Sequence, residues 1–209
     1  MIIVMGLPGA GKSSVLAGAV TPQSDRAGPR GSGAKRSQGN FGTRSEVPEG
    51  TGYAVLNYGT LMFEIAKSEF GLTNRDEMRK LPVAKQKKVQ EAVANRLSRE
   101  KGKAILDTHC SIRTPRGYLP GLPFSLLEKL HVDSLVLVTA TPEEIMGRRK
   151  TDDTRVRDPE PIESVREHDM INKALLAAYA AHRGCPARII YNHDGKLDDA
   201  VRQLKQMLE

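Results

Sequence analysis

A chain of 209 residues is long enough to bury a hydrophobic core of its own, and its formal charge of +7 favours an anionic partner. Aromatic residues make up 4% of the chain and include no tryptophan, which argues against a stacking platform for single-stranded nucleic acid. No stretch approaches the ~20 apolar residues of a membrane-spanning helix, and the two cysteines, Cys110 and Cys185, have no metal-ligand partners at useful spacing. We therefore expect a cytoplasmic protein with reduced thiols, small anionic ligands and no membrane partner, with nucleic acid disfavoured.

Apolar runs alternate with amphipathic stretches from the N-terminus onward. The runs predicted as strands are 2–5, 53–56, 104–106, 134–140 and 187–191. The stretches predicted as helices are 12–20, 61–70, 83–97, 161–183 and 196–208. Near-continuous apolar strands are typical of a parallel sheet covered on both faces, and their alternation with helices predicts βαβ units. The expected fold class is therefore α/β, a three-layer sandwich around a central parallel sheet.

One segment, residues 22–50, departs from this alternation. It is rich in Gly, Pro, Ser and Arg and nearly devoid of large apolar residues, which is the composition of a linker. It leaves only about residues 12–20 for the first helix. We interpret 22–50 as a disordered insertion in a single domain that spans 1–209. The alternative interpretation is a basic tether for nucleic acid.

A phosphate-binding motif stands between the first predicted strand and the first predicted helix. It reads Gly6-Leu7-Pro8-Gly9-Ala10-Gly11-Lys12-Ser13, which fits the Walker A pattern of Gly, four residues and Gly-Lys-Ser. Its glycines let successive backbone amides curl around a β-phosphate, and the N-terminus of the following helix adds partial positive charge. Lys12 then reaches the β- and γ-phosphates, and Ser13 offers its hydroxyl to Mg²⁺. The alternative, a dinucleotide-binding turn, has no use for Gly-Lys-Ser.

A carboxylate follows the predicted strand 104–106. Asp107 is placed where an Asp can hold a magnesium-bound water beside the phosphate loop. An Asp at a strand end is more often a cap or turn residue. The phosphate loop elsewhere in the chain is what favours the magnesium role.

Four arginines lie in one short charged stretch of the sequence, directly after a predicted helix. They are Arg148, Arg149, Arg155 and Arg157. Guanidinium groups suit phosphate oxygens, and a mobile arginine-bearing flap can close over the γ-phosphate and exclude water. A solvated charged loop is the alternative. We favour the flap, because a phosphoryl transferase must keep water from being the acceptor.

Several further motifs stand in order along the chain. They are Asn57-Tyr58-Gly59-Thr60-Leu61-Met62-Phe63, Arg75-Asp76-Glu77-Met78-Arg79-Lys80-Leu81, Asp107-Thr108-His109, Thr114-Pro115-Arg116-Gly117-Tyr118-Leu119-Pro120-Gly121-Leu122-Pro123 and Thr154-Arg155-Val156-Arg157-Asp158. With residues 6–14 they resemble the archaeal adenylate kinase family of nucleoside monophosphate kinases. The resemblance covers nearly everything outside 22–50. It implies the reaction ATP + AMP ⇌ 2 ADP with Mg²⁺, a helical AMP-binding part over 58–100 and a short lid over 149–160. Family members are often trimers, so it also implies a homo-oligomer.

On the donor side, the resemblance extends the nucleotide-binding loop from Gly6 to Ser14. It implies that residues 192–195 border the ATP adenine. It also implies that Arg155 and Arg157 contact the transferring phosphoryl group, so these two residues and Lys12 are the predicted catalytic residues. Ser13 and Asp107 are the predicted metal-binding residues.

On the acceptor side, the resemblance implies that Gly59 and Thr60 border the AMP base and that Arg79 contacts its phosphate. The segment after Asp107 lacks the Gly-Phe-Pro-Arg continuation of bacterial-type adenylate kinases. Arg113 as a second acceptor-phosphate arginine is therefore a hypothesis. The AMP phosphate is already a dianionic nucleophile near neutral pH, so alignment and charge neutralisation suffice without a general base.

Two rival functions stay open from the sequence. One is a P-loop kinase for another small acceptor, such as CMP, UMP or a metabolite, because spacing does not identify the residues that contact the base. The other is an ATP-switched RNA-binding or assembly factor, which the basic segment 22–50 would serve. Salt-dependent RNA binding that is lost on deleting 22–50 would favour the second.

Overall fold

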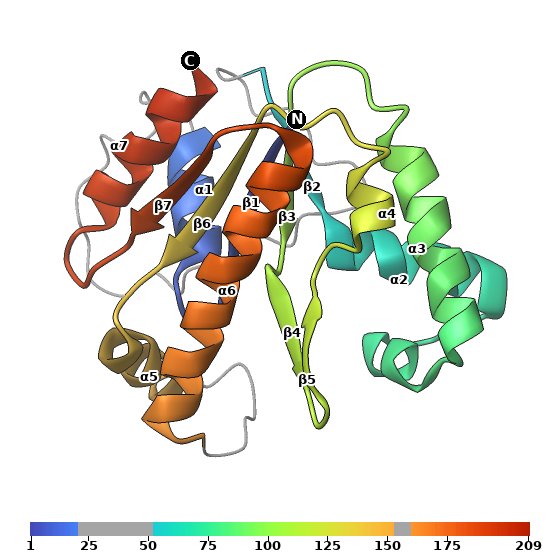
Figure 1. The fold of residues 1–209 in the computed structure, drawn as a ribbon, viewed down its shortest axis with the longest axis horizontal. Coiled ribbons are helices and arrows are strands. Elements are labelled where there is room, and N and C mark those ends of the chain that lie inside the picture. Colours follow the sequence, from blue (N-terminus) through green and yellow to red (C-terminus); the bar gives the residue numbers. More distant parts are fainter. Residues whose placement is uncertain (21–51, 153–159) are drawn as a thin grey trace.

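The computed structural model describes residues 1–20, 52–152 and 160–209. Five parallel strands form its central sheet in the spatial order β2-β3-β1-β6-β7 (Figure 1). The strands are β1 (Ile2–Gly6), β2 (Ala54–Asn57), β3 (Ala104–Thr108), β6 (Ser134–Thr139) and β7 (Ala187–Tyr191). The predicted α/β fold with a central parallel sheet is confirmed.

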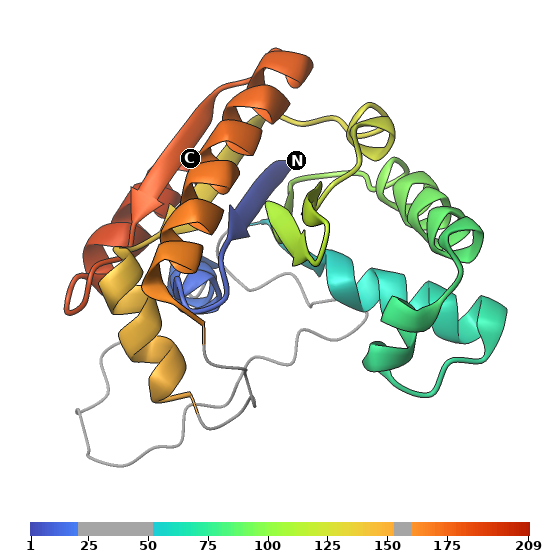
Figure 2. The ribbon, with the colours of Figure 1, turned by 60° about the horizontal axis from the view of Figure 1, so that its bottom comes forward.

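Helices cover both faces of this sheet and give the three layers (Figure 2). The side chains of β1 alternate between two apolar clusters, as the period of a strand requires. Ile2 and Val4 pack in a cluster with residues of α1 (Lys12–Val20) and α7 (Leu197–Leu208). Ile3 and Met5 pack in a second cluster on the other face, together with residues of α6 (Ile162–Arg183). Because both faces of the sheet are buried at β1, this strand is continuously apolar. None of the described helices is long and apolar enough to cross a membrane.

The helical part beside β2 and β3 contains α2 (Tyr58–Phe70), the 3-10 helix η2 (Arg75–Lys80), α3 (Val83–Leu97) and α4 (Phe124–Leu127) (Figure 1). Helix α2 begins three residues before the predicted start at 61, directly after β2. The reason is that Asn57, the last residue of β2, caps the helix with its side chain. At the other end Gly71 takes a left-handed conformation, with φ of 69°, and stops the helix.

A β-hairpin that the sequence did not predict lies against α6. Its strands are β4 (Ser111–Thr114) and β5 (Gly117–Pro120), and they pair antiparallel. The contact with α6 is polar: the Ser111 hydroxyl donates to Asn172 Oδ1 at 2.5 Å and lies 2.9 Å from His168 Nε2. Since the hairpin is held by buried hydrogen bonds, its sequence carries little of the apolar alternation that marks a strand.

The arginine-bearing stretch that begins at Arg148 was expected to follow a helix, but its first residues are themselves helical. Helix α5 (Pro142–Lys150) starts at a capping box made by Thr141 and Glu144 and contains Arg148 and Arg149 in its last turn. These two arginines therefore belong to a helix instead of a flap, as expected for basic residues that oppose the negative end of a helix dipole. Arg155 and Arg157 lie outside the described residues, as does the segment 22–50. The proposed division into an AMP-binding part and a lid stays a prediction.

Gly121, directly after β5, tests whether the backbone is closely packed where the hairpin ends. A Cβ atom at this position would lie 1.9 Å from the carbonyl oxygen of His109, a backbone atom that has no freedom to move aside. We expect Gly121→Ala to destabilise the protein by about 1–3 kcal/mol or more. The control is Gly147→Ala in α5, where a Cβ meets nothing within 4 Å and should stabilise the helix by up to about 1 kcal/mol. Urea unfolding of both variants measures the difference, and equal effects would contradict this view of the turn.

Candidate active site

The phosphate loop leaves the end of β1, at the carboxyl edge of the parallel sheet. Gly9 and Gly11 have φ of +92° and +79°, which L residues with a side chain rarely adopt. A Cβ on Gly11 would also lie 2.2 Å from Asn192 Nδ2. Helix α1 then starts at Lys12, so its N-terminal amides meet the loop. The loop thus has the conformation that anion binding at a helix N-terminus requires.

Backbone carbonyls of the phosphate loop accept hydrogen bonds from side chains of other segments. Arg149 Nε donates to the carbonyl of Pro8 at 2.9 Å, and Asn192 Nδ2 donates to that of Ala10 at 3.0 Å. Arg148 Nη1 lies 3.4 Å from the carbonyl oxygen of Gly9 and 3.3 Å from that of Ala10. With the carbonyls fixed on this side, the loop presents its amide side to a bound anion.

These supporting roles of Arg148, Arg149 and Asn192 are not apparent from the sequence. It assigned the two arginines to a flap and Asn192 to the edge of an adenine site. The one signal for them is position: α5 and Asn192 follow β6 and β7, and the carboxyl ends of parallel strands meet at one edge.

Lys12 lies in a buried ion pair with Asp107. Its Nζ contacts Asp107 Oδ1, and Asp107 Oδ2 accepts a hydrogen bond from Asn57 Nδ2 at 2.9 Å. The two charged side chains are 11% and 5% exposed. Burial lowers the pKa of Lys12 to about 7. Asp107 lies inside β3, not after it, because its backbone pairs with both β1 and β2.

The predicted metal-binding residues fit a magnesium ion. Asp107 Oδ1 is a buried carboxylate oxygen that accepts no hydrogen bond in the described part of the chain, apart from its ion-pair contact with Lys12. Ser13 follows Lys12 in the exposed first turn of α1. The described residues contain no cluster of three or more His, Cys, Asp and Glu able to hold a metal. Magnesium is commonly held by one or two protein oxygens together with substrate phosphates, and Asp107 and Ser13 supply oxygens of this kind.

The predicted acceptor residues Gly59 and Thr60 lie in the first turn of α2, beside Asp107. Thr60 donates its backbone N–H to Asn57 Oδ1 at 2.9 Å, and its hydroxyl accepts from Arg75 Nη2 at 2.6 Å. The structure therefore brings the start of α2 next to the ion pair of Lys12 and Asp107. Arg79 belongs to η2, and its side chain lies outside the described part.

Arg113 lies on β4. It pairs with Glu160 at 2.5 Å and donates to the hydroxyl of Ser164. The other carboxylate oxygen of Glu160 pairs with Arg149 at 2.6 Å. Burial by itself raises the pKa of Glu160, but the hydrogen bond from Ser164 and the charges of Arg149 and Arg113 lower it overall. One carboxylate thus joins the hairpin to the helix that holds the phosphate loop.

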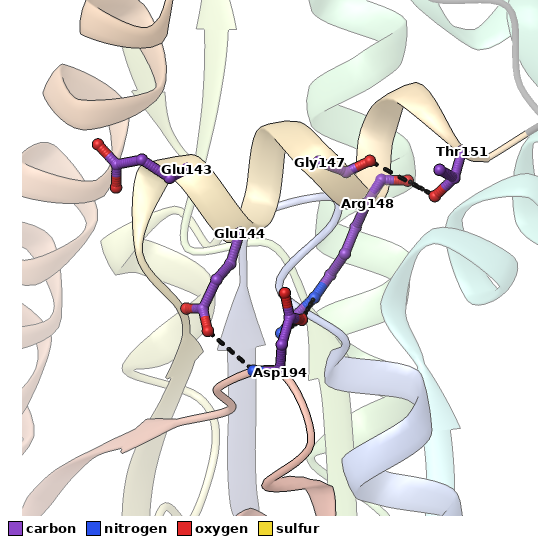
Figure 3. A pocket seen from close by; sticks show the side chains of 6 residues that line it. All are labelled: Glu143, Glu144, Gly147, Arg148, Thr151 and Asp194. Atoms are coloured by element: carbon purple, nitrogen blue, oxygen red, sulfur yellow. Dashed lines mark hydrogen bonds and ion pairs between the residues drawn. The ribbon is translucent and has the colours of Figure 1, made fainter.

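An open hollow of about 560 Å³ lies beside this helix (Figure 3). Its lining residues are Glu143, Glu144, Gly147, Arg148, Thr151 and Asp194. Arg148 ties its two walls together, since its guanidinium pairs with Asp194 at 2.6 Å and donates to the carbonyl of Asn192 at 2.7 Å. The volume is in the range of small-molecule sites.

Comparison with known proteins gives the family. A family model described as an AAA domain matches residues 5–166. The adenylate kinase of Methanopyrus kandleri is 47% identical over 165 residues, which are 77% of this chain and 86% of that protein. The adenylate kinase of Methanocaldococcus jannaschii is 36% identical over 211 residues, an alignment that covers 100% of this chain and 98% of that protein. The chain belongs to the AAA-domain family and, within it, to the adenylate kinases.

Membership of the adenylate kinases confirms the resemblance drawn from the motifs and the predicted enzyme class. Adenylate kinases are nucleoside monophosphate kinases and hence phosphotransferases. A solved structure, the shikimate kinase of Bacteroides thetaiotaomicron, matches with a TM-score of 0.51 and 13% identity, over 99% of this chain and 97% of that one. At that identity it supports the fold alone.

Glu144, which lines the hollow, makes the stability of the fold depend on pH. Burial by itself raises its pKa, but hydrogen bonds from the backbone amides of Asp194 and Thr141, each at 2.8 Å, and from His193 lower it to about 2. A carboxylate whose folded pKa is lowered stabilises the fold above its unfolded pKa of 4.5, and this contribution disappears as the pH falls toward 2.

We expect Glu144→Gln, which keeps an oxygen for the cap, to lower the free energy of unfolding at pH 7 by about 1–2 kcal/mol after allowance for solvent screening. The gap to the wild type should narrow as the pH is lowered from 5 to 3. Denaturant unfolding at each pH is the measurement. Glu143→Gln, one residue earlier and 59% exposed, is the control and should change little. A gap that is constant with pH would refute a charge effect.

Proposed function

We propose that this adenylate kinase transfers the γ-phosphoryl group of ATP to AMP and that Mg²⁺ assists the reaction. The observation that carries the proposal is a convergence at one sheet edge. Lys12 follows β1, Asp107 lies in β3, and Asn57 ends β2 where the acceptor helix begins. The donor loop and the acceptor helix therefore meet around one buried carboxylate.

On the donor side, the loop from Gly6 to Ser14 would bind the β-phosphate through its amides, with the N-terminus of α1 adding positive charge. Lys12 would exchange Asp107 for the β- and γ-phosphates. Ser13 and the carboxylate of Asp107 would hold Mg²⁺, which when bound neutralises charge on the phosphates. The hollow between α5 and residues 192–195 would take the adenine.

On the acceptor side, Gly59 and Thr60 would border the AMP base, while Arg79 and Arg113 are proposed for its phosphate. Arg155 and Arg157 are proposed to stabilise charge on the transferring group. The AMP phosphate is itself the nucleophile, so these side chains need only align and neutralise charge. A homo-oligomer and a cytoplasmic location complete the proposal. The free thiols of Cys110 and Cys185 suit a reducing compartment.

A coupled assay with ATP and a panel of monophosphates tests this proposal directly. We expect AMP to exceed CMP and UMP in kcat/KM by at least about 100-fold, because a site that hydrogen-bonds one base leaves buried polar groups unpaired with another. EDTA should abolish turnover, and added Mg²⁺ should restore it. If another monophosphate is preferred, that monophosphate and not AMP is the acceptor. Binding of RNA without phosphoryl transfer would support the assembly-factor alternative.

Lys12→Ala should remove transfer to below about one-thousandth of the wild-type kcat, because the charge on the γ-phosphate loses its direct partner. The same change strands the buried Asp107 carboxylate, so the free energy of unfolding should also fall, by up to about 3 kcal/mol.

A double variant, Lys12→Ala with Asp107→Asn, separates the two effects of Lys12. Its free energy of unfolding should return most of the way to the wild-type value, because no buried charge is left. Its activity should not return. Recovery of turnover in the double variant would contradict the role given to Lys12.

A further inference from the structure

Asn57 uses both ends of its side-chain amide. Its Oδ1 accepts from the backbone N–H of Thr60 at 2.9 Å and from the hydroxyl of Thr60 at 3.1 Å, which caps α2. Its Nδ2 donates to Asp107 Oδ2 at 2.9 Å. The backbones of Asn57 and Asp107 are paired in register across β2 and β3, so this contact is fixed by the sheet.

We propose that Asn57 is a positioning residue, which holds the Asp107 carboxylate in place when Lys12 leaves it for the nucleotide phosphates and ties it to the first turn of α2. The proposal rests on the donor role given to Lys12 and the acceptor role given to α2. It adds a physical connection between the donor site at Lys12 and the acceptor site at α2, which neither of those roles requires.

Hydrogen-bond accounting supports this role. In the structure, Asp107 contacts Lys12 through Oδ1 and Asn57 through Oδ2. Once Lys12 turns to phosphate, Asn57 Nδ2 is the remaining donor to Asp107 among the described residues. Asp107 is 4% exposed, so a carboxylate without a donor there would carry a large desolvation cost. Asn57 therefore lowers the cost of releasing Lys12.

The chemistry of this position selects asparagine. Aspartate would cap α2 equally well but has no N–H to give, and it would set one carboxylate against another. Serine would also cap α2, but its hydroxyl is too short to reach across to the neighbouring strand at the same time. Only an amide on a short side chain supplies an acceptor to the helix and a donor to Asp107.

The link continues beyond the cap. The Thr60 hydroxyl donates to Asn57 Oδ1 and accepts from Arg75 Nη2 at 2.6 Å, and Arg75 opens η2. An unbroken series of contacts thus runs from Lys12 through Asp107, Asn57 and Thr60 to Arg75. The position of the carboxylate is thereby coupled to the elements that would hold the acceptor.

The test is a double-mutant cycle of Asn57→Ser and Asp107→Asn on the full chain, with ATP affinity measured by calorimetry in EDTA. Asn57→Ser keeps the cap and removes the bridge, so ATP should bind about tenfold more weakly, because Asp107 loses its last donor. In the Asp107→Asn background the same change should alter ATP affinity by less than about twofold. An equal loss in both backgrounds, or no loss in either, would overturn the proposal.

Two further readouts separate positioning from general damage. Affinity for AMP should stay within about twofold of wild type. The control is Asn95→Ser, the same change at an exposed site on α3. Without nucleotide, Asn57→Ser should melt within about 4 °C of this control, because Lys12 still pairs with Asp107. kcat should fall by about 10- to 100-fold, as expected for misaligned reactants. A large drop in melting temperature, or lost AMP binding, would make Asn57 a structural or substrate-binding residue instead.

The ATP cycle does not depend on transfer to AMP. If the wild type fails to phosphorylate AMP, the proposed function fails, whereas the coupling between Asn57 and Asp107 is still decided by ATP affinity. If transfer occurs and the cycle shows additive effects, the proposed function stands and the positioning role fails.

Discussion

The buried ion pair between Lys12 and Asp107 is the contact around which this site is organised. A charge pair at 11% and 5% side-chain exposure is stable only if other groups complete its hydrogen bonding. Asn57 does so from β2, and that requirement fixes where α2 begins. In the proposed function, phosphate would take the place of this carboxylate as the partner of Lys12.

The phosphate loop depends on a second set of contacts behind it. Glycine dihedrals allow the loop, but its carbonyls still need donors, and Arg148, Arg149 and Asn192 provide them from α5 and from the residue after β7. Glu160 then links Arg149 to Arg113 on the hairpin. The cations next to the loop therefore support it structurally, and their charge is in place for an anionic ligand.

Strands and helices were largely predictable because their causes are local. Continuous apolar runs gave all five parallel strands, with shifts of one or two residues at their ends, and the helix 83–97 agrees with α3. The hairpin of β4 and β5 was missed, since its contacts with His168 and Asn172 are long-range and polar. The start of α2 was also placed too late, because its cap is a residue that belongs to the preceding strand.

By itself the sequence determined the phosphate loop, the alternation that makes a parallel sheet, and enough ordered motifs to indicate the family. These are short-range patterns, in which a glycine or a lysine has meaning through its immediate neighbours. Only the tertiary structure decided that Asp107 pairs with Lys12, that Asn57 reaches both Asp107 and Thr60, and that Arg148 supports the loop. Apart from the local cap between Asn57 and Thr60, those contacts join residues more than 40 positions apart, and they exist because the parallel sheet brings the carboxyl ends of its strands to one edge.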